Sequence, residues 1–281
     1  MAAWAFLNTE FMPASEAGLH SSDLAIQRGY AVFDFFKFVE GRPVYLARHL
    51  DRFFRSAAIL RLLPALDQPQ LKTVIHELIH RNSVPDGGIR LTLTGGYSND
   101  GFTLLRPNLL ITQHTYDPPS PELRERGIRL SAFQHQRQLP EAKTTDYLMA
   151  IWARPTLQET GADELLYCRG QHISECPRSN FFLVTQDHTL VTPAEGILKG
   201  VTRQQVLQLA ALDFKVEERD VRLEEIPTAS EAFITSTTKG ILPVLQIDRT
   251  KLGKNRPVTN RLISLLDQHQ QQYLRSVAEE G

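Results

Sequence analysis

Several short runs of the chain alternate apolar and polar residues, and this alternation predicts β-strands. The run Ile89-Arg-Leu-Thr-Leu-Thr94 alternates strictly and stops at Gly95-Gly96, which is typical of a strand with one buried face. The other strand-like runs of the first half lie at 32–39, 44–46 and 109–112, and the first two flank a predicted hairpin turn at 40–43. Apolar residues at helical spacing predict helices over 49–62 and 71–80.

The second half of the chain alternates strand-like and helix-like stretches. Strands are predicted at 128–133, 164–168, 181–185, 189–192, 231–236 and 242–247. Helices are predicted at 146–160, 202–213 and 258–277. Pro155 lies inside the first of these helices and predicts a kink or an early end, and Thr202 is expected to cap the second helix.

A proline-rich segment separates the two halves. Three prolines fall within residues 115–122, which makes this stretch a stiff, extended connector. A chain of 281 residues is long enough for two domains of ordinary size. We therefore expect a mixed α/β (α+β) protein with a small N-terminal domain over 1–114, a linker over 115–122 and a larger domain over 123–281.

Composition and charge exclude several functional classes. The formal net charge of −1 provides no basic surface for nucleic acid or for an anionic membrane, and no run of about 18 apolar residues predicts a membrane span. The first ten residues lack the basic flank and apolar core of a signal peptide. With two cysteines, Cys168 and Cys176, the sequence favours reduced thiols and a cytoplasmic protein.

One sequence motif suggests a metal site. His76-Glu-Leu-Ile-His80 matches the zinc-protease pattern of two histidines one helical turn apart. A zinc enzyme also needs a third ligand downstream, and residues 81–121 contain no glutamate. The three polar residues also fit the solvent side of a helix. We therefore predict an ordinary amphipathic helix and no metal.

The residues that carry chemistry point to pyridoxal phosphate (PLP). A lysine that forms a Schiff base and a carboxylate that holds the pyridine nitrogen are what this cofactor needs from a protein, and Lys143 and Glu175 are candidates. Arg52, a threonine after a glycine at Thr202, and the pair Thr237-Thr238 before another glycine are candidate phosphate ligands.

Six segments in the right order resemble the fold-type IV PLP enzymes, which include branched-chain aminotransferases, D-amino acid transaminases and aminodeoxychorismate lyases. These segments are 28–34, 49–52, 141–143, 161–180, 196–203 and 233–243. The resemblance covers nearly the whole chain. It implies a homodimer of two-domain subunits, with the cofactor between the two domains.

The resemblance also assigns roles to individual residues. It implies that Lys143 forms the Schiff base, that Glu175 pairs with the pyridine nitrogen and that Arg52 binds the phosphate through a fork of donors. Further phosphate ligands are expected at a helix start and in a loop, from Val201, Thr202, Thr237 and Thr238.

Two arginines depart from the common patterns of this family. Position 28 is often aromatic and position 178 is usually small, and we expect Arg28 (from a partner subunit) and Arg178 to bind substrate carboxylates. The loop 95–102 lacks the arginine-any-histidine trap of the well-known D-amino acid transaminases, and the chain is similar to a non-canonical subgroup of them. Tyr147 is a further candidate near the cofactor or substrate.

The resemblance therefore favours a D-amino acid transaminase that uses D-alanine or D-glutamate and 2-oxoglutarate. Two alternatives stay open. An L-branched-chain aminotransferase would act on L-leucine, and an aminodeoxychorismate lyase would release pyruvate without an acceptor.

Overall fold

The computed structural model describes residues 3–279, which form two compact units with one main β-sheet each. The first unit contains the residues up to Asp117, the segment Ala142–Asp146 and the residues from Tyr273 onward. The second contains Pro118–Glu141 and Tyr147–Gln272. This division differs from the predicted one, because the predicted boundaries leave the Lys143 segment in the C-terminal domain.

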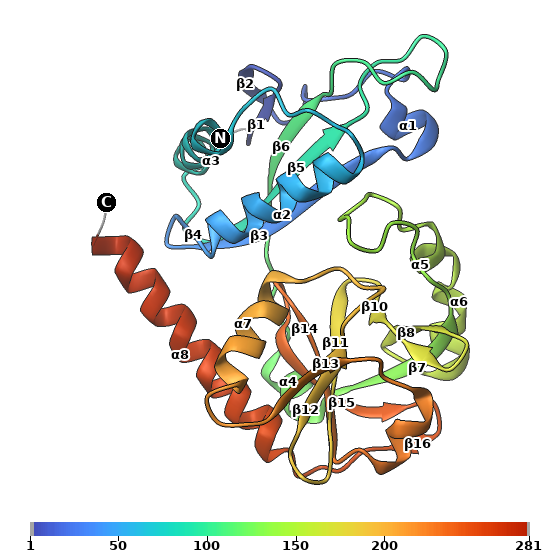
Figure 1. Cartoon of the computed structure of the whole chain (residues 1–281). Helices are drawn as coiled ribbons and strands as arrows, with labels where there is room; N and C mark the ends of the chain where they lie inside the picture. Colours follow the sequence, from blue (N-terminus) through green and yellow to red (C-terminus); the bar gives the residue numbers. More distant parts are fainter. Residues whose placement is uncertain (1–2, 280–281) are drawn as a thin grey trace. The chain divides into compact units, whose positions relative to one another are not determined.

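The sheet of the first unit is antiparallel, with strand order β2-β1-β6-β5-β3-β4 (Figure 1). Its strands are β1 (Trp4–Leu7), β2 (Glu10–Pro13), β3 (Ala31–Val39), β4 (Arg42–Pro43), β5 (Gly87–Thr94) and β6 (Leu109–His114). The helices of this unit are α1 (Leu24–Arg28), α2 (Leu46–Ile59) and α3 (Gln68–Asn82). The strands predicted at 32–39, 89–94 and 109–112 and both predicted helices are confirmed.

The central strand β3 has two different faces. Val32, Phe36 and Phe38 are fully buried and join one apolar core with residues of α2 and α3. Successive side chains of a strand point to opposite faces, so the odd-numbered Phe33 and Phe35 lie on the other face. In register with them on β5 are Thr92 and Arg90, so this second face is more polar. The unit thus covers one face of its sheet with helices.

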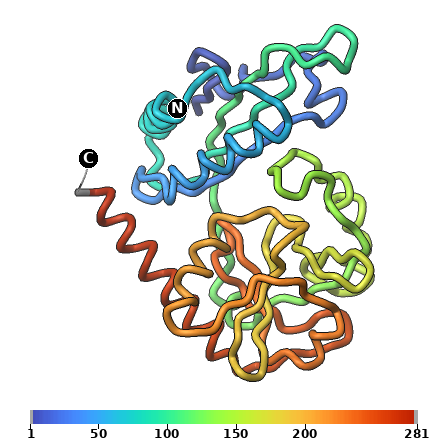
Figure 2. The backbone as a smooth tube through the Cα atoms, viewed as in Figure 1, coloured from blue at the N-terminus to red at the C-terminus, as the bar shows by residue number. Residues whose placement is uncertain are grey.

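The turn after β3 differs from the prediction. The chain reverses at Glu40 and Gly41, both with positive φ, and β4 is formed by Arg42–Pro43. The predicted strand at 44–46 is wrong, since Val44 and Tyr45 form a turn and Leu46 already begins α2 (Figure 2). Pro43 at the edge of the sheet allows the strand to end there, because proline cannot continue the hydrogen-bond ladder.

The helix α3 contains the two histidines of the candidate zinc motif. Asp67 and Gln70 form a capping box at its start. Its apolar side is buried, whereas His76 and His80 are exposed and Glu77 pairs with Arg81 at 2.7 Å. The predicted amphipathic helix is therefore confirmed. Among the residues described, no group of three acidic, histidine or cysteine side chains could hold a metal ion.

The second unit has a larger mixed sheet with strand order β13-β12-β11-β14-β15-β7-β8-β9. Its strands are β7 (Ile128–Gln134), β8 (Glu164–Arg169), β9 (His172–Ile173), β10 (Glu175–Cys176), β11 (Ser179–Val184), β12 (Leu190–Pro193), β13 (Val216–Arg219), β14 (Glu231–Ser236), β15 (Gly240–Ile247) and β16 (Thr250–Lys251). Its helical segments are α4 (Pro121–Arg126), α5 (Leu148–Trp152), α6 (Arg154–Thr160), α7 (Val201–Ala210), the 3₁₀ helix Leu223–Thr228 and most of α8 (Pro257–Glu279). All six strands predicted for this half are confirmed.

Two helix predictions in this unit have different outcomes. The predicted helix 146–160 is broken into α5 and α6 at Ala153, which confirms the kink expected from Pro155. The predicted cap at Thr202 is wrong. Gly200 is the N-cap of α7, and no side chain caps this helix. The helix begins one residue before Thr202 because Gly200 already has the extended backbone of an N-cap residue.

None of the helices in the described part of the chain is long and apolar enough to cross a membrane. Both cysteines are buried free thiols. Burial raises the pKa of the Cys168 thiol to about 12, and it raises the pKa of Cys176 well above its usual value. Thiols that stay protonated at neutral pH are poor nucleophiles, so neither cysteine is a good candidate for a catalytic nucleophile.

Candidate functional site

The segment that carries Lys143 is attached to β3 and to α2. The backbone N–H of Phe33 donates to the carbonyl of Lys143 (2.9 Å), and the N–H of Lys143 donates to Ser56 Oγ on α2 (3.0 Å). The amine of Lys143 lies 4.5 Å from the centre of the Phe33 ring, within the range of a cation–π contact. The predicted catalytic lysine is thus held by a regular strand and a helix.

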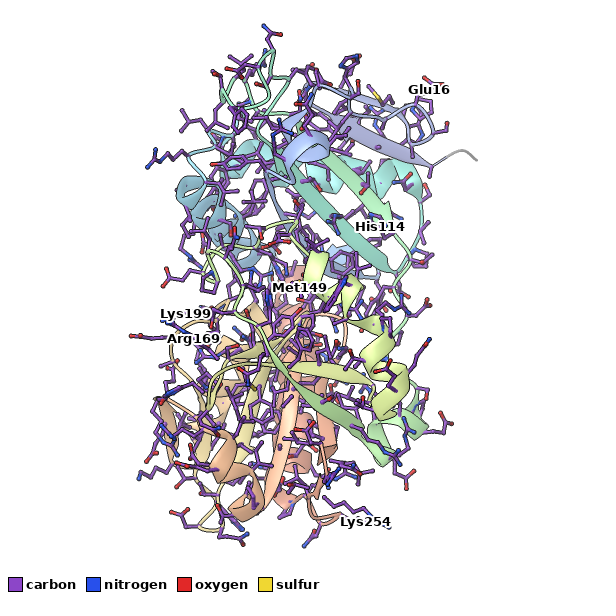
Figure 3. All side chains as sticks on the ribbon, turned by 90° about the vertical axis from the view of Figure 1, so that its right-hand side faces the viewer. Glu16, His114, Met149, Arg169, Lys199 and Lys254 are labelled. Atoms are coloured by element: carbon purple, nitrogen blue, oxygen red, sulfur yellow. The ribbon has the colours of Figure 1, made fainter. Side chains whose placement is uncertain are left out.

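The surroundings of the other lysines separate Lys143 from them. Of eight lysines, five are exposed, and Figure 3 shows Lys199 and Lys254 among the outward-pointing side chains. The remaining two are engaged elsewhere. Lys239 pairs with Glu164 at 2.9 Å, and Lys37 lies over the Tyr116 ring. Lys143 is thus one of three half-buried lysines, and its segment is held by both β3 and α2.

Arg52, the predicted phosphate arginine, is buried on α2 beside two other ionisable groups. Its Nε and Nη2 both donate to the Asp34 carboxylate at 2.8 Å, and His49 Nδ1 contacts the same carboxylate at 2.8 Å. Ser56, which receives the Lys143 N–H, follows Arg52 by one helical turn. The first unit therefore brings together the predicted catalytic lysine and the predicted phosphate arginine.

Arg90 also lies beside the Phe33 ring, and it was not among the residues predicted from the sequence. It lies on β5, and its guanidinium carbon is 4.0 Å from the centre of the same Phe33 ring that the Lys143 amine contacts. Burial, followed by the charge of Arg90, lowers the pKa of the neighbouring His114, labelled in Figure 3. The alternation 89–94 placed Arg90 on the polar face of a strand, but gave no sign that this face holds Lys143.

Arg28, a predicted carboxylate ligand, is exposed at the end of α1. Its guanidinium carbon lies 4.9 Å from the centre of the exposed Phe102 ring, and its Nη1 donates to the carbonyl of Gln27 (3.0 Å). Buried Asp23 caps α1 and accepts hydrogen bonds from side chains at both ends of the loop that carries Phe102. Asp23 therefore holds both the start of the helix that ends with Arg28 and the two ends of the loop that carries Phe102.

In the second unit, Glu175 is buried and surrounded by donors. Its Oε1 accepts from Arg137 Nε (2.8 Å), and its Oε2 accepts from the N–H of Leu198 (3.1 Å) and from Asn180 Nδ2 (3.4 Å). Arg137 is 14% exposed and pairs with this carboxylate at 2.7 Å. Arg137 was not predicted, because nothing in its spacing from Glu175, 38 residues away, indicates the contact.

The loop after β12 leads to an uncapped helix start. Asn180 Nδ2 donates to the carbonyl of Leu198 (2.7 Å), and a Cβ on Gly200 would lie 2.2 Å from Asn180 Oδ1. Val201 and Thr202, both buried, begin α7 directly after this glycine. First-turn N–H groups without a side-chain cap, together with the helix dipole, form a binding site for an anion such as a phosphate.

The turn between β14 and β15 contains the predicted pair Thr237-Thr238. The N–H of Lys239 donates to Ser236 Oγ (3.2 Å), and Ser236 Oγ and Thr238 Oγ1 are 3.4 Å apart. Lys239 Nζ reaches both Glu164 and Ser179 Oγ and so connects this turn to β8 and β11. The hydroxyl groups of the turn are half-buried and suit a polar ligand.

The second unit contains two further predicted residues. Arg178 is exposed at the tip of the β10–β11 hairpin, three residues after Glu175. Tyr147 is half-buried and precedes α5. The second unit therefore places Glu175 beside the loop that leads to α7. Arg178 follows Glu175 by three residues along the chain.

These residues fit the cofactor that the sequence predicts. Arg52 directs two donors at Asp34, and its Nη1 has no hydrogen-bond partner among residues 3–279. Gly200 leaves room where a larger residue would contact Asn180, and the helix behind it carries no capping side chain. A phosphate-bearing pyridine needs anion donors, a buried carboxylate and an amine. The first unit contains an amine and an arginine, and the second contains a buried carboxylate and a helix start.

Comparisons with known proteins identify relatives of this chain. A family model described as amino-transferase class IV matches residues 31–247. The D-alanine aminotransferase of Staphylococcus haemolyticus is 26% identical over 266 residues, which cover 92% of this chain and 94% of the relative. The putative branched-chain-amino-acid aminotransferase of Methanocaldococcus jannaschii is 30% identical over 253 residues, or 86% of this chain and 87% of the relative.

A solved structure has the same fold. The branched-chain aminotransferase from the thermophilic archaeon Thermoproteus uzoniensis, solved with norvaline, matches with a TM-score of 0.85 and 24% identity, covering 95% of this chain and 94% of the other. At this identity the likeness establishes the fold alone, and it confirms the predicted mixed α/β fold.

Proposed function

Because the matching model covers most of its length, the chain belongs to the amino-transferase class IV family, and we propose that it transfers amino groups from D-amino acids to 2-oxo acids such as 2-oxoglutarate. Family membership confirms the predicted enzyme class and the predicted cofactor, because class IV aminotransferases use PLP. It also confirms amino acids and 2-oxo acids as the substrate classes.

One observation carries the proposal about the substrate. The Lys143 amine and the Arg90 guanidinium lie over the same Phe33 ring, at 4.5 and 4.0 Å from its centre. An amine that moves the proton at Cα must act within a few ångströms of the substrate carboxylate, and a guanidinium binds a carboxylate through two parallel hydrogen bonds. We assign Arg90 this role, together with the sequence-predicted Arg28 and Arg178.

The cofactor, when bound, supplies a pyridine ring that absorbs the electron pair left after a proton is removed from Cα. The residues of this chain would hold it. Lys143 would bind it covalently and move the proton, and Glu175 would bind the ring nitrogen. The phosphate would be bound by Arg52, Val201, Thr202, Thr237 and Thr238.

The preference for D-amino acids rests on two kinds of support. Relatives at 26–29% identity, from Staphylococcus haemolyticus and Bacillus licheniformis, are D-alanine aminotransferases. In addition, three arginines (Arg28, Arg90 and Arg178) suit a substrate such as D-glutamate, which has two carboxylates. When the carboxylate is fixed on one side, a single enantiomer directs its Cα hydrogen towards Lys143, and so the arginines would select the hand of the substrate.

The second candidate is an L-branched-chain aminotransferase. It is favoured by the 30% identical relative from Methanocaldococcus jannaschii, which is described as a putative branched-chain-amino-acid aminotransferase. An enzyme of this kind needs an apolar wall for the substrate side chain, and Phe33 and Phe35 on the polar face of β3 would contribute to it. In that case the arginines near the site would shape the wall instead of binding a second carboxylate.

The assembly and location form part of the proposal. Arg28 is exposed at the end of α1, and exposed apolar residues lie nearby at Ile26 and Phe102. A second copy of the chain would cover such residues, so we infer a homodimer in which Arg28 serves the partner subunit. Buried, reduced Cys168 and Cys176 suit a cytoplasmic enzyme.

The test is a visible spectrum of the purified protein, recorded before and after addition of D-alanine, D-glutamate or L-leucine. We expect the aldehyde band of bound PLP to disappear with the D-amino acids alone. Disappearance with L-leucine alone would overturn D-specificity in favour of the second candidate. Repeated release of pyruvate from aminodeoxychorismate, without an acceptor 2-oxo acid, would instead indicate a lyase.

Two arginine variants test whether Arg90 binds the substrate carboxylate. Arg90→Gln should raise the D-glutamate concentration needed for half-maximal loss of the band by about tenfold or more. Arg81→Gln is the matched control, since Arg81 also stacks on aromatic rings of the first unit, those of Trp4 and Phe11, and should change nothing. An unchanged response of Arg90→Gln would remove Arg90 from the site.

A further inference from the structure

The central strand of the first unit carries an acid at a position where its neighbours are apolar. Asp34 lies on β3 between Val32 and Phe36, on the face that packs against α2, and all three residues are fully buried. A buried carboxylate is costly unless it is paired and hydrogen-bonded. A residue that contributes apolar packing would suit this position in a strand, so the presence of an acid needs a reason.

The partners of Asp34 come from one face of α2. Arg52 donates to both carboxylate oxygens, from Nε to Oδ2 and from Nη2 to Oδ1, each at 2.8 Å. His49 Nδ1, one turn earlier on the helix, lies 2.8 Å from Oδ1. The backbone of Phe35 also donates to Oδ1 (2.8 Å), which fixes the carboxylate on its own strand.

Charge in this cluster is nearly balanced. Burial alone would raise the pKa of Asp34, but Arg52 and His49 outweigh that effect and lower it, so the group is an anion at neutral pH. Burial lowers the pKa of His49, which favours the neutral form of this ring. One anion therefore faces one cation, and the cluster offers little net charge to attract a phosphate.

The geometry explains what the acid does instead. A guanidinium has five N–H donors in a rigid plane, and Asp34 engages one edge of that plane with two parallel bonds. Nη2 also lies 3.2 Å from His49 Nδ1, so the free edge of the guanidinium is the one at Nη1, and its direction is then fixed. An arginine side chain otherwise has many rotamers, and holding one of them before the ligand arrives removes that ordering cost from binding.

We propose that Asp34 is a positioning residue, which orients Arg52 so that its free edge receives the phosphate of PLP. This inference rests on the proposed function, since it concerns the phosphate ligand of the same site. It makes Asp34 act through Arg52, without contact to the cofactor.

Two hypotheses predict opposite results for Asp34→Asn. In one, the net charge of the cluster controls PLP binding, and in the other, Asp34 positions Arg52. This substitution removes a negative charge near the phosphate and retains the size of the side chain. If the net charge of the cluster controlled binding, the variant would bind PLP more tightly. If Asp34 positions Arg52, the variant binds PLP more weakly. The asparagine amide can accept through one oxygen only, so the two parallel hydrogen bonds that orient the Arg52 guanidinium cannot both form.

The experiment compares PLP with pyridoxal, which lacks the phosphate. Apoenzyme is titrated with each compound, and the dissociation constants are read from absorbance. For Asp34→Asn we expect a loss of about tenfold or more in affinity for PLP and a change of less than about twofold for pyridoxal. An unchanged or larger preference for PLP over pyridoxal would overturn the proposal.

A second aspartate provides the matched control. Asp23 is also fully buried in the first unit, and it accepts hydrogen bonds from Ala25, Thr94 and Asn108. Asp23→Asn removes the same charge from another cluster, so it should leave the preference for PLP over pyridoxal as in the unaltered protein. An equal loss in both variants would assign Asp34 a general structural role and overturn the proposal.

A third variant keeps the proposal testable should Asp34→Asn fail to fold. Arg52→Lys retains the positive charge but replaces the fork with a single ammonium group, which two parallel bonds cannot orient. It should lose the preference for PLP by a similar factor, and full retention would overturn the proposal. Failure of the proposed function is distinguishable, because it is read from which amino acid removes the band of bound PLP, whereas this titration measures cofactor binding without any amino acid.

Discussion

The two units of the molecule hold their functional groups in different ways. In the first unit, Lys143, Arg52 and Asp34 are fixed by side-chain and backbone bonds between a strand and one helix. In the second, Glu175 is bonded to a loop backbone at Leu198, and the proposed anion site consists of N–H groups at the start of α7. The first unit thus depends on charged side chains, and the second depends on the path of its backbone.

This difference has consequences for mutation. A site built from side chains loses a whole function when a single residue changes, because no other group takes over its role. A site built from backbone N–H groups has no side chain to remove, and is damaged when a new side chain displaces the loop. Substitutions that delete a group should therefore act most strongly in the first unit, and substitutions that add atoms in the second.

Lys143→Ala tests the first half of this comparison and should have the largest effect. It removes the amine that is proposed to bind PLP and to move the proton at Cα, so activity should fall by about 10³-fold or more. The aldehyde band of the bound cofactor should shift or disappear. Lys37→Ala is the control, since Lys37 is the other half-buried lysine of this unit; comparable activity in Lys143→Ala and the unaltered protein would contradict the assignment.

Arg137→Gln tests the exception in the second unit, where a side chain does support the site. The substitution leaves the buried Glu175 carboxylate without its cationic partner, and removal of one member of a buried ion pair costs about 3 kcal/mol or more. Urea unfolding should show this loss. Arg169→Gln is the control, because Arg169 is exposed and points outward in Figure 3. Equal stability of the two variants would argue that Arg137 is expendable.

Gly200→Ala tests the role of the backbone in the second unit. The added Cβ would lie 2.2 Å from Asn180 Oδ1, so either the Asn180 amide, which holds the Leu198 carbonyl, or the loop itself must shift. We expect PLP to bind about tenfold more weakly in an absorbance titration, while the protein stays folded. Gly18→Ala is the matched control, since nothing lies within 4 Å of a Cβ at Gly18. Unimpaired binding would show that the helix start does not hold the phosphate.

His49→Gln should have the smallest effect, and it concerns the stability of the first unit. Burial lowers the pKa of His49 below its value of 6.5 in an unfolded chain. The unfolded state then binds more protons than the folded state as the pH falls below about 6.5, so folding becomes less stable. The free energy of unfolding should fall between about pH 7.5 and about pH 5.5, and fall less steeply in His49→Gln. Identical slopes would show that His49 is not the group responsible.

Much of the fold could be predicted from the sequence, because it depends on local patterns. The alternation in 89–94 identified β5, and helical spacing identified α3 with its polar histidines. Predictions failed where a local signal competed with another: Val44 and Tyr45 are strand-like residues but form a turn, because the chain leaves the sheet after Pro43 and enters α2 at Leu46. Short strands such as β9 and β10 contain two residues each, which is too few to show a period.

The predicted site shows the same limit. The resemblance to a family selected Lys143, Glu175 and Arg52, although nothing in their separation in sequence relates them to one another. Arg90, Arg137 and Asp34 were missed for a common reason. Each acts through a partner distant in sequence, and the property that makes each one important is burial beside an opposite charge or an aromatic ring, which a single sequence does not reveal.

Helix α2 sets the distance between Arg52 and the segment that carries Lys143. Arg52 and Ser56 lie four residues apart, which corresponds to about 6 Å along a helix axis. Ser56 holds the Lys143 backbone, so the helical rise sets the spacing between the phosphate arginine and the lysine segment. A single inserted residue between positions 52 and 56 would turn Arg52 by roughly 100° away from Asp34. A change in the length of this one helical turn would therefore separate the proposed phosphate ligand from the segment that carries the lysine.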